Sequence, residues 1–420
     1  MTVPGEYAPL RFWRNTAVAT LGPTDELTLG QNIVGYEWDP EYPEYADWYP
    51  AGRVLLSTTN LPSFAGSDQH HLSLYRAPSG ALVFGAGTVQ WSWGLDATHD
   101  YGTSTEDLNV QQATVNLFAD MGVQPATLQS GLVTASASTD TAPPTVAVTS
   151  PAAGASVPGG ALTITGTASD TGGAVGVVEI STDAGQTWRR ASGRANWNYT
   201  YVAAEGTADI RVRAADDSLN LSTPLSHTFN VEPRVCSASS PCSLWDDATT
   251  PTEYKQNGNP IETGSRFRTD VAGFIRGIRF YIGQPTSATF TAHLWSNDGQ
   301  LLGEADFPGA GALGWVEATF ATPVPVQANT TYVASYFSPN TYYAYTNGYF
   351  ATAGFANPPL YALRDGEAGA NGVYRYDTPG FPTQTYQSSN YWIDVTFVEE
   401  FASHTFFDGA LPARLERQRE

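Results

Sequence analysis

Short segments of alternating polarity, separated by turns rich in Gly, Pro, Asn and Asp, recur along most of this sequence. Period-two apolar spacing between such turns is typical of half-buried β-strands. The chain has 420 residues. A typical domain has about 100–200 residues, so we expect about two to four domains. The pattern therefore predicts a mostly β, multi-domain protein.

Residues 1–128 differ from the rest because strand-like segments are followed by a helical one at 106–121. We expect Ser104 or Thr105 to cap this helix and Gly122 to end it. Strands followed by a helix are typical of an α/β domain, and a parallel sheet needs helices on both faces. We therefore interpret 1–128 as the last half of an α/β domain. The strand-like segments are 33–38, 54–59, 71–75 and 81–87. The expected apolar helix face consists of Leu108, Val110, Val115, Leu117, Phe118 and Met121.

The remaining chain is predicted to be β apart from its ends. Residues 129–143 are rich in Ser, Thr and Ala and are expected to form a linker. Residues 144–232 have the strand spacing of an Ig-like β-sandwich. Residues 234–398 have the size of a jelly-roll-like β-sandwich, and 399–420 form a poorly ordered tail. The expected Ig-like strands are 145–149, 162–168, 175–181, 209–215 and 227–231, and the later ones are 277–282, 288–296, 315–320, 331–337 and 391–397.

The charge of the chain limits its partners. The formal net charge is −21, and Lys255 is the only lysine. Phosphate contacts depend on Lys and Arg, so nucleic acid is excluded as a partner. No window has the length and polarity of a membrane span, and residues 1–13 lack the features of a signal peptide. We therefore expect the chain to be the C-terminal part of a longer protein, with upstream domains as partners.

Cys236 and Cys242 are the only cysteines. Two isolated cysteines without a nearby His pair do not make a zinc site. A disulfide in an oxidising compartment is the favoured interpretation, with two free thiols as the alternative. The disulfide predicts an extracellular or cell-surface location.

The first part resembles the C-terminal domain of N,N-dimethylformamidase large-subunit-like proteins over about 32–124. The resemblance rests on GYEWD at 35–39, HHLSLYR at 70–76, GAGTVQWSWGLD at 85–96 and QQATVNL at 111–117. It implies a partial α/β, glutamine-amidotransferase-like fold. Members of that family that hydrolyse amides hold a mononuclear iron with Tyr and carboxylate ligands.

The other two parts also resemble bacterial families. The middle part resembles bacterial Ig-like modules, and VEISTDAGQTW at 178–188 is also similar to the dimerisation domain of sulfite-oxidase-type enzymes. Residues of about 236–398 resemble a domain-of-unknown-function family that is appended to large secreted bacterial proteins. The motifs that carry this resemblance include PCSLW at 241–245, FRTDVAG at 267–273, GIRFY at 277–281, TYVASY at 331–336 and NYWIDV at 390–395.

Five residues of the first part are candidates for catalysis: His70, His71, His99, Asp96 and Glu37. Histidine combined with carboxylates suits iron or a general acid–base pair. Neighbouring strand residues point to opposite faces, so the two adjacent histidines do not easily bind one metal. Hydrogen bonding within loops is the competing interpretation.

Four acidic residues in turns of the Ig-like part are candidates for Ca²⁺ binding through oxygen ligands: Asp170, Asp183, Asp216 and Asp217. Ca²⁺ is thus a candidate cofactor, and iron follows only if the amidase-like resemblance carries activity. The competing interpretation is that these carboxylates cap their own turns.

Aromatic residues of the last part are candidates for binding a ligand. Tyr342, Tyr343, Tyr345 and Asn347 combine flat rings with an amide, a mixture that suits polysaccharide binding. Other aromatic residues lie on expected strands and are predicted to fill the core instead. These are Trp295, Trp315, Tyr336 and Trp392.

Three functions follow from these observations. The first is a non-catalytic modular tail of a secreted or surface protein, which acts as a spacer and binds a polysaccharide or another cell-surface ligand. The second is a fragment of an amidohydrolase. The third is a structural or dimerisation module.

Overall fold

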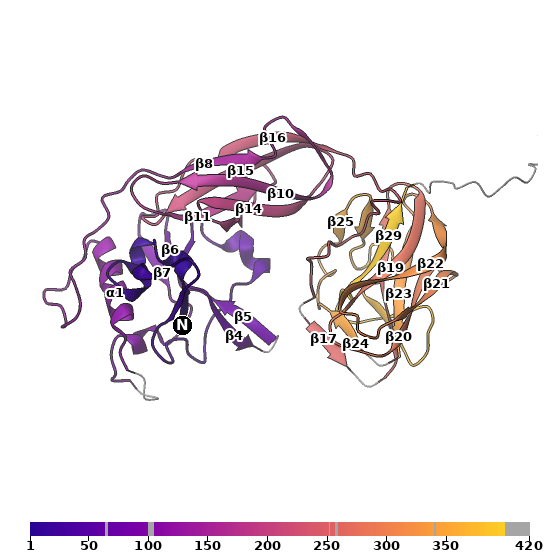
Figure 1. Cartoon of the computed structure of the whole chain (residues 1–420), viewed down its shortest axis with the longest axis horizontal. Helices are drawn as coiled ribbons and strands as arrows, with labels where there is room; N and C mark the ends of the chain where they lie inside the picture. Colours follow the sequence, from indigo (N-terminus) through magenta and orange to yellow (C-terminus); the bar gives the residue numbers. More distant parts are fainter. Residues whose placement is uncertain (64–65, 100–104, 252, 257–258, 340–341, 400–420) are drawn as a thin grey trace, which may run out of the picture. The chain divides into compact units, whose positions relative to one another are not determined.

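The computed structural model describes residues 1–63, 66–99, 105–251, 253–256, 259–339 and 342–399. The chain divides into two compact units, Met1–Pro233 and Arg234–Glu420 (Figure 1). Strands predominate in both, which confirms the prediction of a mostly β protein with several sheets. In the described part of the chain, no helix is long and apolar enough to cross a membrane.

The first module of the first unit is built from small antiparallel sheets. β6 pairs with both β3 and β7, β1 pairs with β2, and β4 pairs with β5. The parallel sheet of a glutamine-amidotransferase-like fold is not shown, since every strand pair of this module is antiparallel in the described residues. The strands are β1 (Thr2–Pro4), β2 (Glu26–Thr28), β3 (Val54–Leu55), β4 (Thr59–Ser63), β5 (Gly66–His70), β6 (Ser73–Arg76) and β7 (Leu82–Gly85). The 3₁₀ helices are Gly5–Tyr7, Arg11–Trp13, Ala17–Thr20, Pro43–Trp48 and Trp91–Gly94.

Segment 33–38 was expected to be a strand and is not one. It contributes a single bridge, between Trp38 and Thr88. Asp39 N donates to Gly87 O at 2.9 Å, and Val89 N donates to Glu37 O at 3.3 Å. The segment is therefore held extended along 86–89, but too few ladder bonds form to make a regular strand.

One α-helix is present among the described residues, α1 (Leu108–Asp120). It is capped by Asp107 and not by Thr105, and the other expected cap, Ser104, lies outside the described residues. The Asp107 Oδ1 atom accepts hydrogen bonds from Asn109 N at 2.7 Å and Val110 N at 3.3 Å. Gly122 ends the helix as predicted, with φ +78°.

The buried face of α1 is more polar than expected. Leu108, Phe118 and Met121 are exposed, whereas Asn116 is fully buried. Its amide nitrogen donates to Phe12 O at 2.9 Å and Arg14 O at 2.6 Å. The 3₁₀ helix Arg11–Trp13 and the residue after it present carbonyl groups to this face of α1. Amide side chains therefore fit there better than apolar ones.

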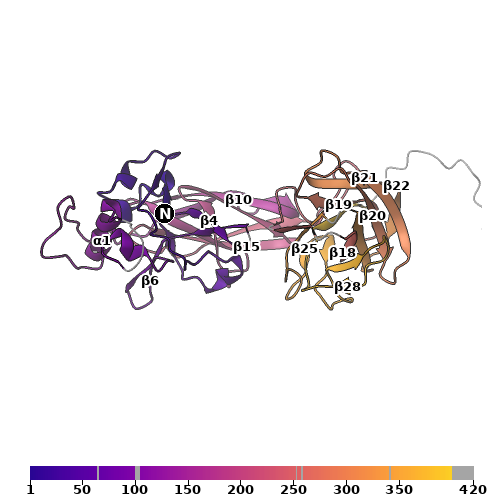
Figure 2. The same cartoon turned by 90° about the horizontal axis from the view of Figure 1, so that it is seen from below.

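The second module of this unit is a sandwich of two sheets that enclose one core (Figure 2). One sheet has the order β13-β14-β10-β8 and the other β12-β11-β15-β16-β9. A Cβ at Gly166 would lie 2.1 Å from the Trp197 ring, so glycine is required there. The strands are β8 (Thr145–Ser150), β9 (Ser156–Pro158), β10 (Gly160–Ser169), β11 (Val175–Ser181), β12 (Arg189–Arg190), β13 (Ser192–Gly193), β14 (Asn196–Ala203), β15 (Gly206–Asp216) and β16 (Leu225–Glu232).

The two modules of the first unit share a hydrophobic core. Val177, Ala215 and Leu219 of the Ig-like module are buried in the same cluster as Val54 and Leu74 of the first module. We call this contact the junction. The junction thus lies within one compact unit, Met1–Pro233.

Segment 129–143, expected to be a linker, is held at several points along its length. Ala135 is buried, and its carbonyl accepts a hydrogen bond from Gln124 Nε2 at 2.7 Å. Val133 N donates to Gln112 Oε1 at 2.8 Å. Asn220 Nδ2 donates to Asp140 O at 3.2 Å. The segment thus follows the surface of the unit.

The second unit has one core between a large and a small sheet. The large sheet has the order β21-β20-β23-β18-β26-β25, with β27 and β28 attached through β18, and the small one has the order β22-β19-β29. Tyr336 and Trp392 are buried in this core, in agreement with their expected packing role. The strands are β17 (Glu253–Gln256), β18 (Ile261–Thr269), β19 (Gly273–Ile282), β20 (Thr289–Ser296), β21 (Leu301–Pro308), β22 (Gly314–Val326), β23 (Tyr332–Ser338), β24 (Tyr342–Tyr345), β25 (Phe355–Asn357), β26 (Leu360–Ala362), β27 (Val373–Tyr376), β28 (Gln384–Thr385) and β29 (Ile393–Val398).

Cys236 and Cys242 form a disulfide, as predicted. Both sulfur-bearing residues are buried in the core of the second unit. Cys242 also exchanges two backbone hydrogen bonds of 2.8 Å with Phe397 of β29. These backbone hydrogen bonds tie the start of the unit, which the disulfide closes into a loop, to its last strand.

Candidate functional site

Three aspartates come together near the junction: Asp140, Asp170 and Asp216. One carboxylate oxygen of each lies within 4.8 Å of the others. Within the described residues, this is the group of His, Cys, Asp and Glu side chains that has the spacing of a metal site. Asp170 follows β10, Asp216 ends β15, and Asp140 belongs to the segment before β8. We call this group the aspartate cluster.

Local turns orient each carboxylate of the aspartate cluster. Asp216 Oδ1 accepts hydrogen bonds of 2.8 Å from Ser218 N and Asn220 N. Asp140 Oδ1 accepts from Ala142 N at 3.0 Å, and Asp170 Oδ2 accepts from Gly172 N at 3.0 Å. Each of these bonds closes a turn that begins at the aspartate.

Two oxygens of the aspartate cluster have no hydrogen-bond partner among the described residues. They are Asp140 Oδ2 and Asp170 Oδ1, and both are buried. Asp216 is fully buried, and this burial raises the pKa of its carboxyl, as does the nearby charge of Asp140. Buried carboxylate oxygens without donors are costly unless a cation satisfies them. An oxygen-only donor set suits a hard cation such as Ca²⁺.

Asp217 and Asp183, the other two Ca²⁺ candidates, serve other contacts. Asp217 Oδ2 accepts from Arg11 N at 2.7 Å, and its Oδ1 accepts from Ala174 N at 3.2 Å, so this carboxylate bridges the two modules. Asp183 caps the turn after β11. Burial would raise its pKa, but hydrogen bonds from Ser181 and Thr187 lower the pKa of Asp183 to about 2.

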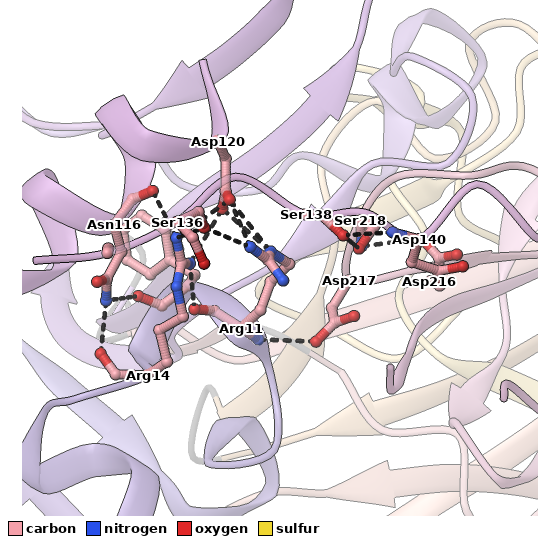
Figure 3. Close-up of polar contacts among 12 residues, drawn as sticks. Arg11, Arg14, Asn116, Asp120, Ser136, Ser138, Asp140, Asp216, Asp217 and Ser218 are labelled. Carbon is pink, nitrogen blue, oxygen red and sulfur yellow. Dashed lines mark hydrogen bonds and ion pairs between the residues drawn. The ribbon is translucent and has the colours of Figure 1, made fainter. Parts of the chain in front are cut away.

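An arginine network lies beside the aspartate cluster (Figure 3). Arg11 and Arg14 both bind the carboxylate of Asp120 at the end of α1, with closest distances of 2.6 and 3.0 Å. Both guanidinium groups also donate to Ser136 O, at 3.2 and 3.1 Å. A cavity of about 290 Å³ is lined by Arg11, Asp120, Asp140 and Asp217. The network holds segment 129–143 next to α1.

A second set of charges crosses the junction on another side. Glu41 of the first module binds Arg190 of the Ig-like module at 3.2 Å and Arg53 at 2.8 Å. Burial would raise the pKa of the Glu41 carboxyl, but the charges of Arg190 and Arg53 lower it. In turn, Glu179 Oε1 of the Ig-like module accepts a hydrogen bond from Gly52 N of the first module at 3.0 Å. These contacts fix the orientation of the two modules as well as their proximity.

The two adjacent histidines lie in different surroundings: His70 is the last residue of β5, and His71 follows that strand. His70 is fully buried, its Nε2–H donates to Ala86 O at 2.9 Å, and its Nδ1 has no partner among the described residues. His71 Nδ1 lies 2.8 Å from Ser57 O, and its Nε2 lies 3.7 Å from Glu41. Burial lowers the pKa of both rings, so they are neutral at pH 7.

The other three catalytic candidates lie elsewhere. The His99 ring stacks on Trp93 with centroids 4.2 Å apart. Asp96 accepts a hydrogen bond from Thr98 N at 2.6 Å. Glu37 lines an open cleft. In the described part of the chain, these residues and the two histidines do not meet in a group with metal-ligand spacing. They therefore do not fit a shared iron site.

The tyrosine candidates of the second unit lie on a strand rather than in a loop. Tyr343 is buried and packs with its ring centroid 5.8 Å from that of Tyr391. Tyr342 and Tyr345 are half-buried on β24, which pairs with β17. Asn347 Oδ1 accepts a hydrogen bond from Ser389 Oγ at 2.9 Å. The cavity at Tyr342 and Tyr343 has a volume of about 10 Å³, room for no more than a water molecule.

Three protein families match separate parts of the chain. Residues 2–106 match the family described as "N,N-dimethylformamidase beta subunit-like, C-terminal". Residues 144–212 match "Bacterial Ig domain", and 248–393 match "Domain of unknown function (DUF4082)". These are the three families expected from the sequence, so that expectation is confirmed.

No curated protein matches this chain. Among solved structures, the fibronectin(III)-like modules of Clostridium thermocellum CbhA are 32% identical, with 21% of this chain and 99% of that chain covered and a TM-score of 0.19. A SusE-like protein is 12% identical, with 60% and 97% covered and a TM-score of 0.16. Chitinase ChiA74 from Bacillus thuringiensis is 10% identical, with 69% and 50% covered and a TM-score of 0.16. None of these TM-scores indicates a shared fold over the whole chain.

Proposed function

We propose that this chain is a non-catalytic modular segment of an extracellular or cell-surface bacterial protein, in which Met1–Pro233 acts as one rigid support. The observation that carries this proposal is the junction, where Val177, Ala215 and Leu219 of the Ig-like module enter the core of the first module. Flexibly tethered modules would bury no common core, whereas this Ig-like module has a core of its own and also contributes residues to the core of the first module. A shared core makes a stiff spacer instead.

The disulfide, the bacterial Ig domain and the polar, acidic composition support an extracellular location. The ligand of the segment, in this proposal, is a polysaccharide or another cell-surface molecule. In the second unit, Tyr342 and Tyr345 are the half-exposed candidates for contacting it. We also propose that this unit is a jelly-roll-like sandwich, because one core lies between its two main sheets.

The rigidity of the support can be tested by limited proteolysis of the full chain with subtilisin. Most of segment 129–143 is exposed, but hydrogen bonds to Gln112, Gln124 and Asn220 hold its backbone against the unit. We therefore expect no early cleavage within it, because backbone that is held in place does not readily enter a protease active site. Early cleavage in that segment would show a flexible spacer and would contradict the proposal. Mass spectrometry of the fragments identifies the cut sites.

Amide hydrolysis is the alternative function, since residues 2–106 match a dimethylformamidase-like family. The non-catalytic part of the proposal is supported by the candidates His70, His71, His99, Asp96 and Glu37, which do not form a group with metal-ligand spacing in the described residues. Purified protein should release no amine from simple formamides and carry no stoichiometric iron. Turnover together with bound iron would establish the enzyme instead.

A bound Ca²⁺ at the aspartate cluster is a second element of the proposal. Its support is the pair of buried, unpartnered oxygens on Asp140 and Asp170. Because Asp140 comes from the segment that precedes the Ig-like module, a cation there would fasten that segment to β10 and β15. Isothermal titration with CaCl₂ should detect one site per chain in the wild type and none in the Asp170→Asn variant.

A further inference from the structure

We infer that the first module binds a polysaccharide with uncharged or amine-bearing sugars in an open cleft lined by Tyr36, Trp38 and Tyr42. This inference goes beyond the proposed support function, because it places a binding surface on the first unit itself. The cleft has a volume of about 1220 Å³. That is the size of a site for several linked sugars rather than for a small metabolite.

Two of the three aromatic side chains that line this cleft, Tyr36 and Tyr42, are exposed, and Trp38 is half-buried. Tyr36 is 78% exposed, Tyr42 is 44% exposed, and Tyr45, whose ring centroid lies 5.7 Å from that of Tyr42, is 54% exposed. Most of the other large aromatic residues of this unit are buried or half-buried. Exposed aromatic groups that gather in one place mark a binding surface, because burying them in a core would stabilise the fold more.

The cleft is held in a fixed shape. The β-bridge between Trp38 and Thr88 and the hydrogen bond from Asp39 N to Gly87 O hold segment 36–42 alongside segment 86–89. Residues of both segments line the cleft. The Trp38 ring packs edge-on against the buried His70 ring at 6.4 Å. Tyr49 Oη accepts a hydrogen bond from Tyr42 N at 3.0 Å, which anchors the backbone of Tyr42. A wall that is already in place loses little entropy when a ligand binds.

The charge of the cleft selects the class of ligand. Glu37, Asp39 and Asp68 line it, and none of the described residues that line it is Lys, Arg or His. Carboxylates accept hydrogen bonds from sugar hydroxyls or amines, and the flat rings offer faces for the C–H side of a sugar. Nucleic acids and acidic polysaccharides would be repelled. The combination of stacking faces with acceptors therefore fits an uncharged or amine-bearing polysaccharide.

Titration calorimetry on the full chain tests this inference with four probes: cello-oligosaccharide, chitin oligosaccharide, chitosan oligosaccharide and polygalacturonate. We expect at least one of the first three to bind and polygalacturonate not to bind. Tyr36→Ala should weaken binding about 10-fold, because one stacking ring is lost. Tyr386→Ala removes a tyrosine of the second unit that is 56% exposed, and it should leave binding unchanged.

Two results would overturn the inference: binding to none of the first three probes, or equal affinity in the wild type and a Tyr36→Ala, Tyr42→Ala double variant. Both tyrosines are exposed, so their loss leaves the fold intact, and circular dichroism verifies this. If chitosan binds best and Glu37→Gln weakens only that probe, the amine is recognised. If the uncharged probes bind as well as chitosan, the hydroxyl groups are recognised. A failure to bind leaves the protease resistance of 129–143 unaffected, so it is distinguishable from a failure of the rigid support.

Discussion

Leu219 offers the sharpest perturbation of the junction. It belongs to the turn after β15 of the Ig-like module, is 6% exposed, and packs in the core of the first module. Replacing it with Ala removes buried carbon atoms and leaves a cavity, which costs about 2–4 kcal/mol. Leu219 has φ +67°, and Ala carries the same Cβ, so the substitution adds no new backbone strain.

Because the core is shared, this loss of stability should appear in both modules. Hydrogen exchange with mass spectrometry should show that the opening free energies of α1 and β15 both fall by about 2–4 kcal/mol, because the two elements open together. Leu225→Ala is the matched control. Leu225 starts β16 of the same module but is 38% exposed, so its loss should cost less than about 1 kcal/mol. If Leu219→Ala loosened β15 and left α1 unchanged, the two modules would be energetically separate and the reasoning would be wrong.

Three further predictions concern the cation, a buried histidine and the disulfide. Ca²⁺ at 100 times its dissociation constant should stabilise the first unit by about 2.7 kcal/mol, measured by urea unfolding, and Asp170→Asn should abolish the effect. Burial would lower the pKa of His293, but its hydrogen bond to Glu262 raises that pKa above 6.5. The pair therefore stabilises the folded second unit fully below pH 6.5, and this stabilisation is lost as the pH rises through the folded-state pKa. Urea unfolding measured at several pH values from about 5 to about 9, a range that brackets the pKa of a histidine, should show this decline in stability. The Glu262→Gln variant should show a flatter pH dependence. Reducing the Cys236–Cys242 disulfide, which spans six residues of sequence, should destabilise the second unit by about 2 kcal/mol, and an unchanged midpoint in urea would refute that estimate.

The sequence predicted the strands of the Ig-like module well because their apolar residues alternate between Gly-, Pro- and Asp-rich turns. β11 (Val175–Ser181) was expected with its observed bounds, and β8, β10, β15 and β16 differ by a few residues. β14 (Asn196–Ala203) was missed, although Trp197, Tyr199 and Tyr201 alternate along it. Its polar positions resemble those of a loop until the facing β10 is known.

The candidate site was predictable only in part. Asp170 and Asp216 were among the candidates because each follows an expected strand, where acidic residues often close turns. Asp140 was not, since it lies in a Ser-, Thr- and Ala-rich segment whose neighbours are set by the tertiary fold. For the aromatic residues, it was the exposure of the side chains that the sequence did not predict. Tyr343 was a candidate for a ligand and is buried, whereas Tyr36 lies in a segment expected to be a strand and is exposed. Exposure depends on which segments pack together, and local spacing does not reveal that.

Differential scanning calorimetry of the full chain tests most directly whether Met1–Pro233 is one rigid unit. We predict two transitions, one for each compact unit, with equal calorimetric and van't Hoff enthalpies in the transition of the first unit. Reduction of the disulfide should shift the other transition and so identify it. Three transitions, or a calorimetric enthalpy well above the van't Hoff value for the first unit, would show that its modules unfold independently and would contradict the account.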